Sequence, residues 1–303
     1  MSAEVLCVGH AAYDLSMFVE KFPAENSKAE IEKLIESGGG PAANAAWLLT
    51  MWGMPCAFAG LVGDDHYGQC IRAELEAAGT DVSLLESLPQ HATPVSVILI
   101  NKRNGSRTVV NRKLPGRALK LNATALASMS PKVLLFDGHE LDASLAALQA
   151  FPEAVSILDA GSWREGTAVL AENVDYLVAS ERFARQATNC AELHDDKTRR
   201  ACMGQLRERF PKTVVVTLGE HGLIVNDGSG FRHLPAFLAQ AVDTTGAGDI
   251  FHGAFAFAVA RSMPLWESLR FASMAASLSV RKPGGRASFP PLPKVQEALT
   301  HAG

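Results

Sequence analysis

Short unbroken apolar runs alternate with helical patterns along most of this chain. The runs that predict buried strands cover residues 5–9, 56–63, 133–137, 155–159, 176–179 and 213–217. Helices are predicted at 42–52, 66–78 and 271–280. Because continuous apolar strands separated by helices are typical of a parallel sheet covered on both faces, the pattern predicts an α/β fold. Ligands of such sheets bind at the carboxyl ends of the strands.

Two segments interrupt this alternation. Strands predicted at 95–100 and 107–111 flank Asn104-Gly105, a dipeptide that favours a tight hairpin, and 28–35 alternates weakly like an exposed strand. We predict a small β lid, built from segments of approximately 15–36 and 92–117 inserted in one domain of residues 1–303. An apolar lid face needs a cover, so we expect a homodimer that forms through the lid.

Composition narrows the function classes. The 303 residues are 48% hydrophobic and carry a net charge of −4, which argues against nucleic acid as a partner. The five cysteines form no CxxC pair, which indicates a reducing, cytoplasmic setting. No signal peptide is apparent, and no apolar stretch reaches the roughly 20 residues that cross a membrane, so no membrane association is expected.

The segment 243–249 carries the sequence Asp-Thr-Thr-Gly-Ala-Gly-Asp and precedes an apolar helix. Small residues leave backbone N–H groups bare, and a helix start adds unpaired donors, so the segment suits an anion such as a phosphate. Asp249 beside that anion would act as a base toward a transferring phosphoryl group. An ordinary capped loop is the alternative for this segment alone.

A second cluster of glycines, Gly38-Gly39-Gly40, precedes the small-residue helix that contains Asn44. The glycines would let the backbone approach a ligand, and a sugar hydroxyl would pair the Asn44 amide. Asp14 follows the first strand and would accept two hydroxyls of a polyol. Structural roles, as a loop asparagine and a turn cap, compete with both readings.

Two further loops are weaker candidates. The turn 217–222 lies between two strands and would let adenosine or phosphate approach. The loop 281–288 follows the helix at 271–280, and its carbonyls and Ser288 could bind a cation, although a surface loop needs no ligand.

Together these segments resemble the PfkB, or ribokinase-like, family of carbohydrate kinases over essentially the whole chain. The two signature regions of that family correspond to 38–46 and 243–256. The resemblance implies a ribokinase-like three-layer fold, with a central mainly parallel sheet, helices on both faces and a small β lid. It also implies an ATP-dependent kinase that phosphorylates a sugar hydroxyl.

The resemblance also assigns roles to residues. Asp249 would be the catalytic base, beside an anion hole of backbone N–H groups from Gly246, Ala247 and Gly248. Sugar hydroxyls would be held by Asp14, Gly39, Gly40 and Asn44. ATP would lie along Thr217, Gly219 and Gly222, with Ser273 near the adenine. Mg²⁺ would bridge the phosphates, and a monovalent cation, K⁺, would bind near Asp243, Thr245 and Ser288.

One motif departs from the family pattern. The family usually carries Asn-x-x-Glu after a central strand, tied to magnesium, and here the stretch reads Ser180-Glu181-Arg182-Phe183. Both motif residues are replaced, and Glu181 is at best a partial substitute as a magnesium ligand. A catalytically impaired sugar-binding sensor is therefore an alternative to the kinase.

Within the family, 38–46, 231–237 and the ending Arg-Lys-Pro-Gly-Gly-Arg-Ala-Ser resemble sulfofructose kinases, whose ketose carries a sulfonate. Lys28, Asn111 and Arg112 of the lid would contact such an anionic end. His139 stands where the resemblance leads us to expect an arginine, which favours a neutral ketose or a sugar phosphate instead. A nucleoside kinase of the same fold is a further alternative, against which the charged lid argues.

Overall fold

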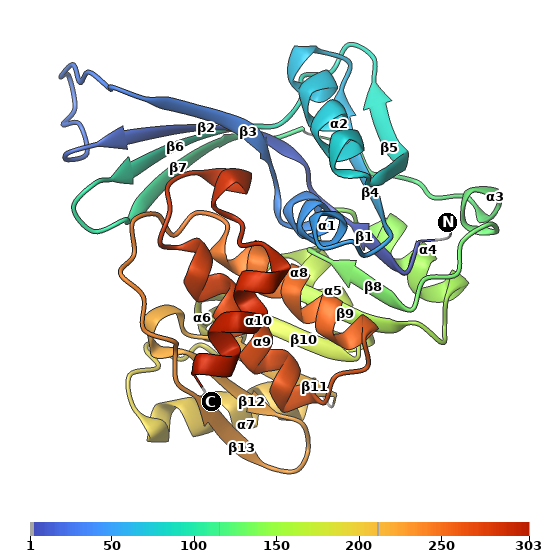
Figure 1. The fold of residues 1–303 in the computed structure, drawn as a ribbon. Helices are drawn as coiled ribbons and strands as arrows, with labels where there is room; N and C mark the ends of the chain where they lie inside the picture. Colours follow the sequence, from blue (N-terminus) through green and yellow to red (C-terminus); the bar gives the residue numbers. More distant parts are fainter. Residues whose placement is uncertain (1–2, 115, 211, 303) are drawn as a thin grey trace.

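A nine-stranded sheet forms the centre of the computed structural model, which describes residues 3–114, 116–210 and 212–302 (Figure 1). Its strands lie in the order β13-β12-β11-β10-β9-β8-β1-β4-β5. All neighbours are parallel except β11-β12 and β12-β13, which are antiparallel. The strands are β1 Val5–Val8, β4 Cys56–Gly63, β5 Asp81–Leu88, β8 Val133–Phe136, β9 Val155–Ala160, β10 Tyr176–Ser180, β11 Thr213–Thr217, β12 Leu223–Asn226 and β13 Phe231–Leu234.

Helices cover both faces of this sheet. Because side chains alternate along a strand, Val5 and Cys7 of β1 enter one apolar core while Leu6 and Val8 enter the other. The first core is completed by α1 Pro41–Met51, α2 His66–Ala78, α8 Ala247–Ala260, α9 Leu265–Ser279 and α10 Leu292–His301. The second is completed by α3 Ala123–Leu126, α4 Leu141–Ala150, α5 Glu165–Asn173, α6 Glu181–Thr188 and α7 Asp196–Arg209. The predicted three-layer α/β fold is confirmed.

A separate four-stranded sheet extends from the body beside α2 (Figure 1). Its order is β3-β2-β6-β7, with β2 Ala12–Val19 parallel to β6 Val95–Asn101, and with β3 Leu34–Gly39 and β7 Arg107–Arg112 antiparallel to their neighbours. The hairpin predicted around Asn104-Gly105 is present. We call this sheet the lid. Residue 115 of the predicted lid segments and both ends of the predicted 1–303 domain lie outside the described residues.

One local prediction for the lid is wrong, and two strands were missed. The strand expected at 28–35 begins only at Leu34 and continues to Gly39, because its register is set by pairing with β2, from Met17↔Leu34 to Ala12↔Gly39. Asp14 follows the first strand, as predicted, but it lies inside β2, a strand that the sequence analysis missed. The edge strand β5 was also missed, since its exposed positions give it a half-polar pattern.

The loop 281–288, whose default reading was a surface loop, is also different in the structure. Its second half forms a short 3-10 turn, η2 Gly285–Ser288, in which Arg286 and Ser288 are buried. No helix among the described residues is long and apolar enough to span a membrane.

Asp137, directly after β8, joins three elements beneath the lid. Its buried carboxylate accepts hydrogen bonds from the backbone N–H groups of His10 (2.8 Å), Ala42 (3.2 Å) and His139 (3.0 Å). Burial would raise the pKa of Asp137, but the charge and hydrogen bond of His139 and the His10 donor hold that pKa below its usual range. Asp137 thus connects the ends of β1 and β8 to the start of α1.

We predict that Asp137→Ala lowers the free energy of unfolding by about 3 kcal/mol, because three backbone donors lose their acceptor in a buried position. Urea denaturation followed by circular dichroism measures the change. The control is Glu153→Ala, which removes an exposed carboxylate and should stay within about 0.5 kcal/mol of the unchanged chain. Equal effects of the two substitutions would contradict this role.

Candidate active site

The residues predicted as a base and an anion hole meet at the start of α8. Gly246 is the N-cap with φ +75°, a left-handed conformation that glycine adopts without strain, and Asp249 lies in the first turn. Among the described residues, the N–H groups of Gly246 and Gly248 donate to no acceptor, and that of Ala247 makes only a long bond of 3.4 Å to Thr244. These donors and the helix dipole favour an anion beside Asp249.

The Asp249 carboxylate is half-buried and has one defined side-chain partner. Asn44 Nδ2, from α1, donates to Asp249 Oδ2 at 2.7 Å. Burial, and after it the charge of Asp159, raises the pKa of Asp249 to about 6, although the Asn44 hydrogen bond opposes this rise. Asp249 is therefore mostly ionised at neutral pH and yet a stronger base than an ordinary aspartate.

The negative charge of Asp249 also acts on Asp14. Its carboxylate is buried, and burial raises the pKa of Asp14 to about 7, with the charge of Asp249 acting in the same direction. Gly39 lies against it, since a Cβ added at Gly39 would come within 2.0 Å of Asp14 Oδ2. Gly40 has φ +96° and approaches the His10 carbonyl, where a Cβ would lie at 2.4 Å.

The space beside Gly38 and Gly39 is filled by side chains of the protein. A Cβ at Gly38 would lie 2.5 Å from Arg286 Nη1, just as one at Gly39 would strike Asp14. The sequence analysis expected these glycines to make room for a ligand. In the structure they let Asp14 of the neighbouring strand β2 and Arg286 of η2 lie against the β3 backbone.

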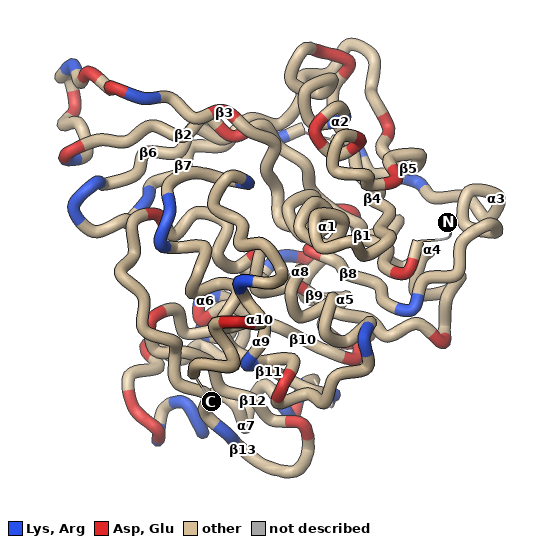
Figure 2. The backbone as a smooth tube through the Cα atoms, viewed as in Figure 1, with Lys and Arg blue, Asp and Glu red and all other residues tan. Residues whose placement is uncertain are grey.

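The lid residues predicted for an anionic substrate are less concentrated. Lys28 lies exposed in the segment between β2 and β3, and Asn111 is exposed on β7 opposite Ser96. Arg112 Nη2 donates to the Thr93 carbonyl at 2.9 Å. Figure 2 shows acidic and basic positions side by side at the outer end of the lid, so that end has no single sign of charge.

His139 is held away from a simple anion-binding role. Its Nδ1 lies 3.1 Å from Asp137 Oδ1, and its ring stacks on that of His10 at 4.5 Å. The His139 ring therefore has two partners within the protein, the Asp137 carboxylate and the His10 ring.

The residues predicted along ATP follow β11. Thr217 ends the strand, and Gly219 and Gly222 bracket a 3-10 turn with φ of +58° and +83°. A Cβ at Gly222 would lie 2.0 Å from the Leu234 carbonyl, so the packing of this turn on β13 already requires a glycine there. Ser273 is half-buried on α9.

The predicted cation residues lie where two loops meet. Asp243 is buried, and its carboxylate accepts from Thr245 N and from Gly284 N, each at 2.8 Å, which joins the loop before α8 to the loop before η2. Ser288 Oγ donates to the Gly285 carbonyl at 2.8 Å. The buried Thr245 Oγ1 has no partner among the described residues. An unpaired hydroxyl oxygen beside a buried carboxylate fits an oxygen-binding cation such as K⁺.

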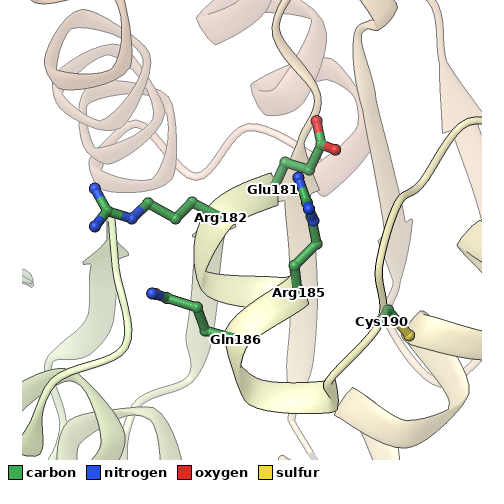
Figure 3. A pocket seen from close by; sticks show the side chains of 5 residues that line it. All are labelled: Glu181, Arg182, Arg185, Gln186 and Cys190. Atoms are coloured by element: carbon green, nitrogen blue, oxygen red, sulfur yellow. The ribbon is translucent and has the colours of Figure 1, made fainter.

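The side chains around Glu181, in contrast, argue against a magnesium site at this residue. This residue begins α6 and lines a cavity of about 610 Å³ together with Arg182, Arg185, Gln186 and Cys190 (Figure 3). Two guanidinium groups in that cavity oppose a divalent cation. Within the described ranges, no three His, Cys, Asp or Glu side chains converge as metal ligands. The residues present do not form a magnesium site of their own.

The sequence analysis missed several polar groups around Asp249. Arg107 of β7 donates through Nη1 to the carbonyl and Oγ1 of Thr244, at 2.7 and 2.8 Å, and so joins the lid to the anion-hole loop. His252, one turn after Asp249, lies 3.1 Å from Asp159. These residues stand alone in the sequence, and no local pattern marks them.

Comparisons with known proteins agree with this geometry. A ribokinase of Lactococcus lactis is 26% identical over 98% of this chain and 97% of its own length. A nucleoside kinase of Methanothermobacter thermautotrophicus is 27% identical over 95% of this chain and 92% of its own length. The structure of Arabidopsis thaliana ribokinase, complexed with ribose and ATP, superposes with a TM-score of 0.83 at 24% identity and covers 99% of both chains, which confirms the ribokinase-like fold.

The family itself is shown by the sequence as a whole. The profile of the pfkB family carbohydrate kinases matches residues 2–292, which include both predicted signature regions. The relatives named above are ribokinases and a nucleoside kinase, so the narrower resemblance to sulfofructose kinases stays a prediction. The chain belongs to the pfkB family of carbohydrate kinases, and the predicted enzyme class, an ATP-dependent phosphotransferase, is confirmed.

Proposed function

We propose that this enzyme transfers the γ-phosphoryl group of ATP to a hydroxyl of a ketose or related sugar. The observation that carries the proposal is the pairing of Asp249 with open backbone donors at the start of α8, since base and anion site then face one reacting group. Asp14, Gly39, Gly40 and Asn44 would hold the sugar. The ribose and ATP bound to the Arabidopsis ribokinase support a sugar and a nucleotide on this fold.

The chemistry fits a late proton transfer. The transition state of phosphoryl transfer is loose, so the attacking hydroxyl loses little of its proton early in the reaction. Asp249 first orients the hydroxyl and then takes the proton, for which a pKa of about 6 is better suited than one near 4. The N–H groups of Gly246, Ala247 and Gly248 stabilise the charge of the transferred group.

ATP would bind along Thr217, Gly219, Gly222 and Ser273. K⁺ would bind near Asp243, Thr245 and Ser288. Mg²⁺ would arrive on the phosphates of ATP, because Glu181 lies among arginines. The free cysteines among the described residues fit the cytoplasm as the location. One lid face exposes Leu34 and Val110, which supports a homodimer that covers it.

The choice of sugar is the narrower part of the proposal. An anionic ketose, with a sulfonate or phosphate at one end, would meet Lys28, Asn111 and Arg112 of the lid, and His139 is the further residue predicted to contact the substrate. A neutral ketose is the competing substrate within the same reaction.

Two alternative functions are each supported by one specific observation. The Methanothermobacter relative supports a nucleoside kinase, in which a nucleoside replaces the sugar. The arginines beside Glu181 support a sensor that binds sugar without turnover. ADP release from a panel of sugars and nucleosides distinguishes the three, because a sensor binds a sugar tightly and releases no ADP.

We expect Asp249→Asn to lower kcat by about 10²–10⁴-fold, since the base is lost while the hydrogen bond from Asn44 can be kept. ADP release measures kcat, and circular dichroism shows whether the variant is folded. Asp196→Asn, an exposed carboxylate on α7, is the matched control and should leave kcat unchanged. Near-normal turnover by a folded Asp249→Asn variant would reject the base.

The pH dependence should follow the raised pKa values of the site. Because the base acts only when ionised, kcat/KM for the sugar is expected to fall as pH decreases through about 7 to 6, the pKa values of Asp14 and Asp249. Initial rates between pH 5 and 9 at saturating ATP measure this. A rate that stays flat down to pH 5 would contradict a base with a raised pKa.

Thermal shift with pairs of sugars tests the anionic end. A ligand that binds the native state raises the melting temperature by mass action. With a non-hydrolysable ATP analogue present, a phosphorylated or sulfonated ketose should raise it more than the neutral parent does. This difference should shrink in Lys28→Gln. Equal shifts from both sugars would favour a neutral substrate.

A further inference from the structure

One continuous chain of hydrogen bonds runs from α2 to Asp249. Glu74 Oε2 lies 2.7 Å from Arg286 Nη1, Arg286 Nε donates to Asn44 Oδ1 at 3.2 Å, and Asn44 Nδ2 donates to Asp249 Oδ2 at 2.7 Å. The four side chains come from α2, η2, α1 and α8. Through Arg286, the Glu74 carboxylate of α2 is linked to Asn44, which is the hydrogen-bond partner of the proposed base Asp249.

The direction of each bond follows from what each group can offer. A guanidinium has only donors, and an ionised carboxylate has only acceptors. The amide between them must therefore turn its oxygen to Arg286 and its nitrogen to Asp249. Without the guanidinium, the Asn44 amide could rotate and present its oxygen to the carboxylate, which repels an ionised Asp249.

The surroundings are shaped for this guanidinium. Arg286 is 5% exposed, and a Cβ at Gly38 would come within 2.5 Å of its Nη1. Gly38 N donates to the same Glu74 oxygen at 2.8 Å, so β3 and Arg286 share one acceptor. Burial lowers the pKa of Arg286, while the charges of Glu74, Asp14 and Asp249 counteract this and favour the cation.

The buried Arg286 guanidinium is not explained by the stability of the fold. Arg286 Nη2 is buried and has no hydrogen-bond partner among the described residues. A buried cation with an unpaired donor costs free energy, and replacing a whole buried ion pair by well-packed neutral side chains is often neutral or stabilising. A cation kept here is better explained by its effect on Asn44.

We propose that Arg286, held by Glu74, is a positioning residue of the kinase: it sets the orientation of the Asn44 amide and thereby the place and charge of Asp249. This inference deepens the proposed function and rests on it. Arg286 acts through Asn44, so it needs no contact with substrate. Its loss should affect kcat far more than the KM for ATP.

The first experiment is a double-mutant cycle on turnover. Arg286→Gln should lower kcat about 10- to 100-fold, because small misplacements of a catalytic group are this costly. In an Asn44→Ala background the same substitution should lower kcat less than 2-fold, since the group through which it acts is gone. Effects that multiply, or a wild-type kcat in Arg286→Gln, would overturn the proposal. Lys282→Gln, an exposed cation of the same loop, is the matched control and should change nothing.

A second readout needs no turnover. A carbon-13 NMR titration of the Asp249 carboxyl should show a higher pKa in Arg286→Gln, because a cation and an ordered donor are lost. The groups that face this carboxyl in the unchanged protein are Asn44 of α1, Asp14 of β2, Arg107 of β7, Asp159 of β9, His252 of α8 and Arg286 of η2. An unchanged pKa would overturn the proposal.

Stability separates positioning from a structural role. Arg286→Gln leaves Glu74 without its cation, so its melting temperature is expected to fall by a few degrees whatever the role of Arg286. Arg286→Gln combined with Glu74→Gln removes the whole pair and should restore the melting temperature but not kcat, whereas recovery of both would show a structural role. If Arg286→Gln does not fold, the role is structural unless Arg286→Lys, which keeps the cation without the planar fork, folds and loses turnover severalfold. A wild type that phosphorylates no sugar would instead refute the proposed function, and the NMR titration would still test Arg286.

Discussion

The close packing of α1 against α8 is the contact on which the site depends. Gly253 of α8 leaves so little space that an added Cβ would lie 3.1 Å from Ala45 Cα. Small residues along α1 allow this approach, and they place Asn44 within hydrogen-bonding distance of Asp249. Larger side chains at this contact would separate the helices and break the Asn44–Asp249 pair.

Around this contact the protein buries an unusual number of ionisable groups. Burial raises the pKa values of Asp14 and Asp159 to about 7 and that of Asp249 to about 6. Such groups are destabilising, because the native state must either protonate them or keep charges out of water. Two apolar cores on opposite faces of the sheet offset this cost, and the resulting polar centre is where a proton can be held and moved.

The lid and the catalytic loop are not independent parts. Arg107 donates to the carbonyl of Thr244, and Thr244 Oγ1 in turn donates to the Gly105 carbonyl at the lid hairpin. The lid also contributes Asp14, so the same small sheet contacts the loop before α8 and faces the carboxylate of Asp249, the proposed base. A movement of the lid therefore changes the surroundings of both.

Local sequence was sufficient for much of the frame. Apolar runs that form continuous buried strands, the Asn-Gly hairpin, and the Gly-Ala-Gly-Asp start of α8 are all short-range patterns whose physics is local. The same patterns, with the family resemblance, predicted the kinase class, which is confirmed, and pointed to Asp249 and Asn44, whose side chains the structure brings together. The strand predicted at 28–35 was wrong for a nonlocal reason, since its true bounds depend on pairing with β2, a strand that the local pattern did not reveal.

Tertiary structure decided what lies between distant segments. Glu74, Arg107 and Arg286 are single charged residues in ordinary surroundings along the chain, and only folding brings them to Thr244, Asn44 and the glycines of β3. The pKa of Asp249 likewise depends on burial and on neighbours from five other elements, and no single stretch of sequence contains them. By itself the sequence determined the class of fold and reaction, because those follow from local pattern. The orientation and charge of the base were decided by the tertiary structure, because they follow from contacts across the chain.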